Sequence, residues 1–245
     1  MLRSLRGLRN YAIGATDDEI GKVHSFLFDG RTWGIRYLVV DTGTWLPGRK
    51  VLVAVSALGR PNWPDHIFPV ALTKEQVKNA PDIDTEKPVS RQREIELHQH
   101  YGWAPYWGLG YGVPAGGVPL PPPVDPDDAK AAAKGDPHLR STREVTGYRI
   151  HASDGEIGRV EDFIASDENW IIRHLVVDTR KWLPGRTVLI PPDWAGEIRW
   201  DDQAVHVDVA KEKVKNAPAY DSSAGVNREY EIQMYDYYGR PKYWP

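Results

Sequence analysis

Seven acidic residues recur at a fixed spacing of 137 residues, and paired carboxylates can serve general acid–base catalysis or bind hard metal ions. A catalytic pair needs two carboxylates held close together with shifted pKa values. The recurring acids instead fall in turns, at strand ends and on helix surfaces, so we predict turn, capping and solvent-facing roles, and no enzyme activity. The pairs are Asp17/Asp154, Glu19/Glu156, Asp41/Asp178, Asp65/Asp202, Glu75/Glu212, Asp84/Asp221 and Glu94/Glu231.

Histidines are the other candidate bases and metal ligands. The chain has eight, and none lies 137 residues from another. His98 and His100 fall on a predicted helix, where residues i and i+2 point to different sides, so we expect no chelation there. The segment from Asp17 to Glu19 could attract a hard cation, but it lacks the spacing of a calcium loop. The glycines from Gly108 to Gly112 have no helix after them, so they form no phosphate loop. We predict no metal and no cofactor.

Two arginine pairs also recur, Arg36 with Arg173 and Arg49 with Arg186. Each could bind an anion, but we favour a bridge to a local acid such as Asp41 or Asp178. The net charge of −3 and the pI near 6.2 argue against nucleic acid as a partner, because such proteins usually carry a basic surface.

The composition indicates a cytoplasmic protein. Its 245 residues include no cysteine, which excludes disulfides and thiolate chemistry. About 41% of the residues are hydrophobic, and no window approaches the roughly 18 to 20 apolar residues of a membrane-spanning helix. The start, MLRSLRGLRN, has no apolar core, so we do not expect a secretory signal or a transmembrane segment.

The recurring acids and arginines belong to an internal duplication of the chain. Between Tyr11 and Trp107, 44 of 97 residues are identical to the residue 137 positions later, without a gap. A period of this length indicates two copies of a whole domain and not a solenoid, whose repeats span about 20 to 50 residues. The lead-in LRSLRGLRNY also aligns with LRSTREVTGY, so we expect the start of the chain to belong to the fold. We predict domains at 1–107 and 138–245.

The segment 108–137 reads as a linker between the two copies. Glycine and proline dominate its first half, and an acidic, alanine-rich stretch follows. This composition cannot pack a core and is typical of a spacer. Its LPPP stretch could also be a polyproline ligand for a partner.

Each copy predicts short strands followed by helices. In the first copy we expect strands near residues 11–15, 20–28, 35–42, 50–55 and 66–70. Thr73 opens a short helix with Gln76 as a capping box, and Pro81 ends it. A second helix covers 91–101, matched by 228–238. This order predicts a mainly β fold with one small antiparallel barrel per copy and short C-terminal helices.

The centre of the third predicted strand, Leu38 to Val40, is apolar on both faces. One face can line a barrel. The other requires a cover, which a helix, a terminus or a second subunit could provide.

These motifs resemble the PRC-barrel family. The resemblance rests on D-x-E-I-G-x-V (Asp17 to Val23, Asp154 to Val160), the L-V-V-D strand, V-L-V/I and a short helix ending N-A-P, and it covers residues 8–81 and 145–218. Such barrels occur in the cytoplasmic part of the photosynthetic reaction-centre H subunit and in a ribosome-maturation protein. The transmembrane helix of the former and the additional N-terminal domain of the latter have no counterpart here. The resemblance implies a non-enzymatic module that docks onto a protein or onto another barrel.

The repeated W-L-P-G-R turn is the candidate contact surface. Its tryptophan could fold back over its own barrel, or it could contact the other copy or another chain, since Trp and Arg are typical interface anchors. Two similar domains on a long linker can pair about a pseudo-twofold axis, and the aromatic tails could reach across. The predicted interaction residues are Trp45, Leu46, Arg49, Trp182, Leu183, Arg186, Tyr101, Trp103, Tyr106, Trp107, Tyr238, Tyr243 and Trp244.

Two classes of function remain. The first is a protein-interaction or assembly module with an unidentified protein partner, linked by resemblance to photosynthetic machinery, whose barrels pair within one chain or form a homo-oligomer. The alternative is a protein that binds a small molecule or metal ion in a groove between the two barrels.

Overall fold

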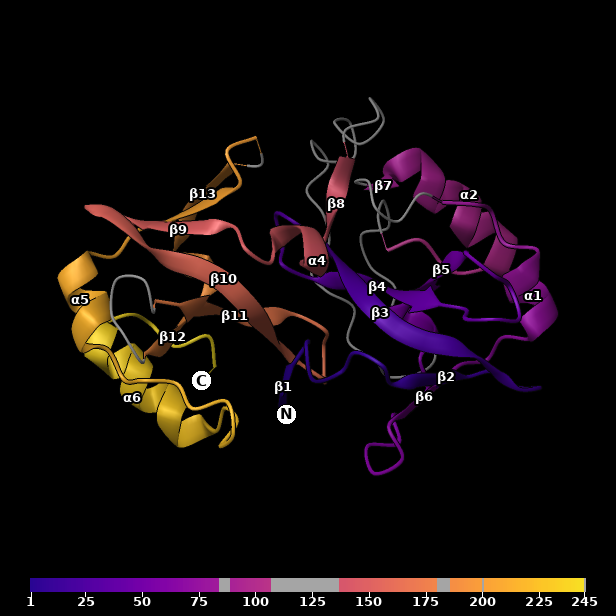
Figure 1. The fold of residues 1–245 in the computed structure, drawn as a ribbon, viewed down its shortest axis with the longest axis horizontal. Coiled ribbons are helices and arrows are strands. Elements are labelled where there is room, and N and C mark those ends of the chain that lie inside the picture. Colours follow the sequence, from indigo (N-terminus) through magenta and orange to yellow (C-terminus); the bar gives the residue numbers. More distant parts are fainter. Residues whose placement is uncertain (84–88, 107–136, 180–185, 200, 245) are drawn as a thin grey trace. The chain divides into compact units, whose positions relative to one another are not determined.

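The computed structural model describes residues 1–83, 89–106, 137–179, 186–199 and 201–244. It forms two compact units. Unit 1 contains Met1–Arg6, Val145–Asp167 and Ile172–Pro245, and unit 2 contains Gly7–Glu144 and Glu168–Ile171. Each unit is built on one β-sheet with helices packed beside it, so the chain is mainly β, as predicted (Figure 1).

The sheet of unit 2 follows the order β5-β4-β3-β2-β6. A short strand β7 pairs with β8, and β8 also pairs with β3. The predicted strands at 20–28, 35–42 and 50–55 are confirmed to within one residue at each end. The strand bounds are β2 Ala12–Gly14, β3 Glu19–Asp29, β4 Ile35–Asp41, β5 Lys50–Ala54, β6 Ile67–Pro69, β7 Val89–Ser90 and β8 Pro137–Ser141.

The sheet of unit 1 follows the order β12-β11-β10-β9-β14-β13, and β1 pairs with β10. Strand β12 ends directly before Pro191 and Pro192, as expected because proline cannot donate to a ladder. The strand bounds are β1 Leu2–Ser4, β9 Arg149–Ala152, β10 Gly155–Ser166, β11 Ile172–Asp178, β12 Thr187–Ile190, β13 Ala195–Arg199 and β14 Ala204–Val207.

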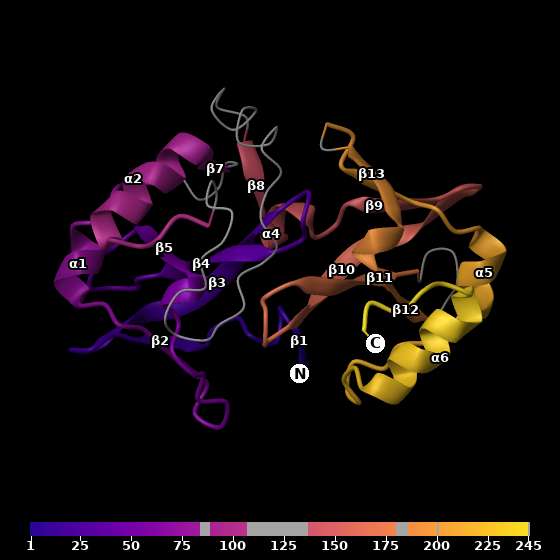
Figure 2. The same ribbon diagram turned by 180° about the vertical axis from the view of Figure 1, so that it is seen from behind.

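The two copies exchange their lead-in strands. Strand β1 of the first copy pairs antiparallel with β10 of the second, with Leu2 opposite Ser166. Strand β8 of the second copy pairs with β3 of the first, with Leu27 opposite Ser141. In Figures 1 and 2, the indigo β1 therefore lies beside the orange-brown β10, and the salmon β8 beside the indigo β3. The start of the chain belongs to the fold, as the sequence predicted.

This exchange makes the units differ from the predicted domains at 1–107 and 138–245. The hairpin tip Glu168–Ile171 also belongs to unit 2, where the carbonyl of Trp170 accepts the N–H of Ile35 at 2.7 Å. The lead-ins have the same pattern in both copies, LRSLRGLRNY and LRSTREVTGY, so the sequence does not distinguish the two possible pairings. The predicted linker lies outside the described residues except for Pro137, which begins β8.

One neighbouring strand pair in each sheet is parallel, namely β2 with β6 and β9 with β14. The antiparallel prediction is wrong for these pairs, because the chain crosses back to the first strand and enters beside it in the same direction. Among the described residues, neither path of paired strands returns to its first strand to close a ring.

In the described part of each copy, two helices follow the strands, and the second of them has the predicted bounds in both copies. These are α2 (Arg91–Tyr101) and α6 (Arg228–Tyr238). The shorter helices are α1 (Lys74–Lys78) and α5 (Lys211–Asn216), and the capping box of Thr73 and Gln76 is present at α1. A further short helix, α4 (Thr142–Val145), follows β8. Over the described ranges, no helix is both long and apolar enough to cross a membrane.

Helix α2 provides the cover that β4 requires. Leu97 of the helix joins Tyr37 and Val39 of β4 and Leu52 of β5 in one buried cluster. Leu139 of the exchanged strand β8 belongs to the same cluster and is fully buried. The predicted cover over Leu38 to Val40 is therefore a helix, and the exchanged strand is part of the core.

The glycine of the repeated D-x-E-I-G-x-V motif is required by a close backbone contact. A Cβ atom on Gly21 would lie 2.1 Å from the carbonyl oxygen of Asp41, and one on Gly158 would lie 2.1 Å from that of Asp178. Both glycines also have a positive φ, +147° and +153°, which other residues rarely adopt. The motif therefore lets β3 approach β4 closely at Asp41, and β10 approach β11 closely at Asp178.

Candidate functional site

The W-L-P-G-R turn of the first copy folds back onto its own unit. The indole N–H of Trp45 donates to the carbonyl of Ile20 in β3 at 2.8 Å, and the Lys74 ammonium lies 5.0 Å from the centre of the ring. The carbonyl of Leu46 accepts from the hydroxyl of Thr42 at 2.7 Å. Trp45 thus contacts its own unit, and its contact with another chain stays a prediction. Its counterparts Trp182 and Leu183 lie outside the described residues.

The arginine of this turn caps the C-terminus of a helix in both copies. Arg49 donates to the carbonyl of Lys78 at 2.7 Å and also to that of Ala80, just beyond α1. Arg186 donates in the same way to carbonyls at the end of α5. The last carbonyls of a helix lack partners within the helix, and a cation there also complements the helix dipole. The predicted bridges to Asp41 or Asp178 are therefore wrong for this pair.

The tail tyrosine of unit 2 enters a buried network centred on Glu94 of α2. Glu94 is fully buried, and its carboxylate accepts from Tyr106, from Tyr37 of β4 at 3.0 Å and from Arg91 at 2.7 Å. His98 Nε2 lies 2.8 Å from the Tyr37 hydroxyl. Because that hydroxyl gives its single proton to Glu94, His98 Nε2 is the donor to Tyr37. We call this group the carboxylate network.

Unit 1 repeats the network 137 residues later. Glu231 of α6 accepts from Tyr243 of the tail at 2.8 Å and from Arg228 at 3.0 Å. His174 of β11 takes the place of Tyr37, with its Nε2 2.9 Å from the Glu231 carboxylate. Both copies therefore tie one strand, one helix and one tail to a single carboxylate.

Burial keeps the tyrosine and histidine partners of these carboxylates neutral. Burial, and then the nearby Glu94, raise the pKa of Tyr37 and of Tyr106 well above the ordinary value. Burial and the hydrogen bond to Glu231 raise the pKa of Tyr243 to about 12. Burial lowers the pKa of His98 and of His174, against the opposing pull of the glutamates. At neutral pH the hydroxyls are donors and the imidazoles are uncharged.

The size of the adjacent cavity distinguishes a catalytic from a structural role for the network of unit 2. The cavity beside Tyr37, His98 and Tyr106 measures about 20 Å³. Such a space holds about one water molecule and no substrate. The network therefore holds the tail and the helix against the sheet.

The other predicted tail residues also pack within their own units. Tyr101 stacks on Trp103 at 4.3 Å between ring centres, and Tyr238 lies 4.6 Å from Trp194. Trp244 contacts Tyr235 at 5.1 Å. The recurring Arg36 and Arg173 lie 4.1 and 4.2 Å over the rings of Tyr106 and Tyr243, and Arg36 is also 3.5 Å from Asp29. Trp107 lies outside the described residues.

Among the recurring acids, those at the turns have the predicted roles. Asp17 and Asp154 accept the first N–H groups of α1 and α5, at 3.0 and 2.8 Å. The prediction is wrong for Glu94 and Glu231, which are 0% and 2% exposed instead of facing solvent. Asp84 lies outside the described residues. In the part of the chain that is described, no group of three or more acids and histidines could hold a metal ion.

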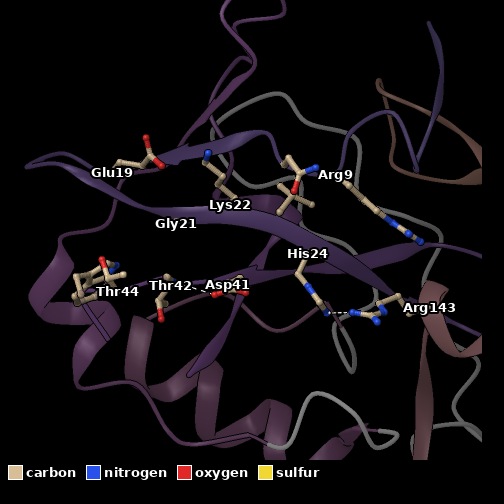
Figure 3. A pocket seen from close by; sticks show the side chains of 13 residues that line it. Arg9, Glu19, Gly21, Lys22, His24, Asp41, Thr42, Thr44 and Arg143 are labelled. Carbon is tan, nitrogen blue, oxygen red and sulfur yellow. Dashed lines mark hydrogen bonds between the residues drawn. The ribbon is translucent and has the colours of Figure 1, made fainter. Parts of the chain in front are cut away.

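A cleft of about 700 Å³ lies along β3 of unit 2 (Figure 3). We call it the β3 cleft. Its walls include Arg9 before β2, Lys22 and His24 on β3, Trp45 in the repeated turn, and Arg143 on α4. Arg143 donates to His24 Nε2 at 2.5 Å. The sequence predicted none of these basic residues as a site, because Arg143 reaches the cleft through the exchanged lead-in.

Comparison with known proteins adds little to these observations. No family model matches the chain. An uncharacterized protein of Deinococcus radiodurans is 35% identical over 101 residues, and the match covers 36% of this chain and 36% of that protein. The chain thus spans about a third of the length of the relative that it matches.

Proposed function

We propose that the chain is a tandem PRC-barrel protein that acts in the cytoplasm, without catalysis, as a protein-interaction and assembly module. The residues that recur in both copies support this proposal, because those described above serve the fold. Gly21 and Gly158 permit a close approach of two paired strands, Arg49 caps a helix, and Glu94 ties a tail to the sheet.

The exchange of β1 and β8 carries the proposal. Each sheet includes one strand that comes from the other copy. Addition of a strand to a sheet edge is a common way for proteins to bind one another. The added segments are held specifically: Arg3 pairs with Asp167 at 2.9 Å, and the backbone N–H of Arg6 donates to Asp162 at 2.9 Å.

We expect the two halves to stay together when the connection between them is cut. The full chain is given a protease site within residues 107–136, cleaved, and passed through size exclusion with light scattering. The fragments should elute as one 1:1 complex, because each half holds a strand of the other. The variant Leu139→Asp, at a fully buried position of β8, should weaken the complex. Fragments that separate into stable monomers at micromolar concentration would contradict the pairing.

The external partner is proposed to be a protein of the photosynthetic reaction-centre machinery, on the strength of the family resemblance alone. Ile95 and Ile232 occupy equivalent positions on α2 and α6 and remain 39% and 37% exposed. They are therefore candidate contact residues, in addition to those of the predicted turns. Capture from the native organism with the full chain should recover the partner, and Ile95→Ser with Ile232→Ser should lose it. The control is Glu96→Ala on the same helix. A partner recovered equally by all three chains does not use these residues.

Ligand binding is the second candidate function, and the β3 cleft favours it. This cleft lies within unit 2, whereas the predicted groove was between the two barrels. Thermal melting with divalent metals, quinones and chelators distinguishes the candidates, because a ligand that binds only the folded state raises Tm.

A further inference from the structure

The walls of the β3 cleft carry more positive than negative charge. Arg9, Lys22 and Arg143 face two carboxylates, Glu19 and Asp41. Asp41 already accepts the N–H of Gly43 in its own loop at 2.9 Å. In Figure 3, Arg9, His24 and Arg143 gather toward one end of the cleft, whereas Glu19 lies toward the other end. One end of the cleft is therefore basic.

Comparison with unit 1 shows that this charge is specific to unit 2. Arg143 and Arg6 are equivalent residues of the two exchanged lead-ins. In unit 1, Arg6 forms an ion pair with Glu161 at 3.0 Å. In unit 2, the residue equivalent to Glu161 is His24, which accepts from Arg143 as an uncharged imidazole. The same arginine thus meets a carboxylate in one unit and a neutral base in the other.

A second substitution changes the charge in the same direction. Arg9 of the cleft corresponds to Thr146 in the other copy, whereas Lys22 corresponds to another cation, Arg159. The four positions carry three positive charges around the β3 cleft, and a net charge of one at the equivalent place in unit 1. A requirement of the shared fold would act equally on both copies, so it does not explain this difference.

We propose that the basic end of the β3 cleft binds the phosphate or carboxylate group of a small molecule. Guanidinium groups bind such oxyanions with short, paired hydrogen bonds. The volume of about 700 Å³ exceeds that of a lone phosphate and lies within the range of small-molecule sites, roughly 300 to 1,000 Å³. The half-buried Trp45 ring, held by its hydrogen bond to Ile20, gives the cleft a fixed wall for the rest of the ligand.

Titration of the full chain with inorganic phosphate, pyrophosphate and citrate, at constant ionic strength set with sodium chloride, tests this site. Calorimetry and Tm should show saturable binding of at least one of the three probes. Phosphate and pyrophosphate without citrate would identify a phosphate site, and citrate alone a carboxylate site. The variant His24→Glu should lower the affinity about tenfold or more, because it gives Arg143 the carboxylate that Arg6 already has.

The equivalent position in the other unit provides the control. Glu161→Gln changes the charge beside Arg6 and leaves the β3 cleft as it is, so the affinity for the probe should stay unchanged. Arg143→Gln should reduce binding as His24→Glu does, with the chain still folded by circular dichroism. The site is overturned if none of the three anions binds below millimolar concentration, or if His24→Glu binds as tightly as the unaltered chain.

Discussion

The variant Glu94→Ala is expected to lose about 3 to 5 kcal/mol of unfolding free energy, the cost of breaking a buried ion pair by removing one partner. The side chains of Arg91 and Glu94 are 7% and 0% exposed, and the same carboxylate also accepts from Tyr37 and Tyr106. Without it, a guanidinium and two hydroxyls lose their shared acceptor inside the protein. Urea unfolding followed by tryptophan fluorescence measures the change.

The same helix offers a matched control. Arg93 and Glu96 form an ion pair with the same spacing, 2.8 Å apart, but their side chains are 57% and 39% exposed. Exposed pairs contribute little, so Glu96→Ala should cost about 0.5 kcal/mol or less. Glu231→Ala should fall between the two, because Arg228 is 52% exposed and remains hydrated. Equal effects of Glu94→Ala and Glu96→Ala would show that burial does not decide the contribution of these carboxylates.

The variant Gly21→Ala is expected to destabilise unit 2 by about 3 kcal/mol or more, as overpacking against rigid backbone adds to backbone strain. The new Cβ would lie 2.1 Å from the Asp41 carbonyl oxygen, and backbone cannot yield as a flexible side chain can. Gly158→Ala should have the same effect on unit 1. Thermal and urea unfolding measure both.

Gly43→Ala separates the contact from the backbone strain. Gly43 also has a positive φ, +63°, but no described atom lies within 4 Å of the position of its Cβ. Only the cost of the left-handed conformation remains, about 1 to 2 kcal/mol. If Gly21→Ala costs no more than Gly43→Ala, the strands can shift apart, and the repeated glycine has no packing role.

The local elements could be predicted from the sequence because short-range patterns encode them. The capping box at Thr73, the stop before Pro191 and the bounds of α2 follow from neighbouring residues, and the structure confirms them. The exchange of β1 and β8 could not be predicted. Both lead-ins share one pattern, so the sequence says that each pairs with a sheet edge but not which copy provides that edge.

The carboxylate network was missed for a related reason. Its signal was present, since R-x-x-E-I at the start of both helices is followed twelve residues after the glutamate by a tyrosine. The apolar residues around Glu94 gave no sign that this acid faces the sheet. The strand partner of the glutamate differs between the copies, since it is Tyr37 of β4 for Glu94 and His174 of β11 for Glu231. A search for residues identical in both copies therefore did not find it.

The exchange of strands also sets an order for protein synthesis. A ribosome that has made residues 7–106 has released most of one sheet, but the edge of β3 stays bare until residues 137–141 emerge. Strand β1, made first, waits even longer for β10. A nascent chain therefore carries two unsatisfied strand edges through much of its translation. Such edges are where neighbouring chains on one messenger RNA could pair with each other by mistake.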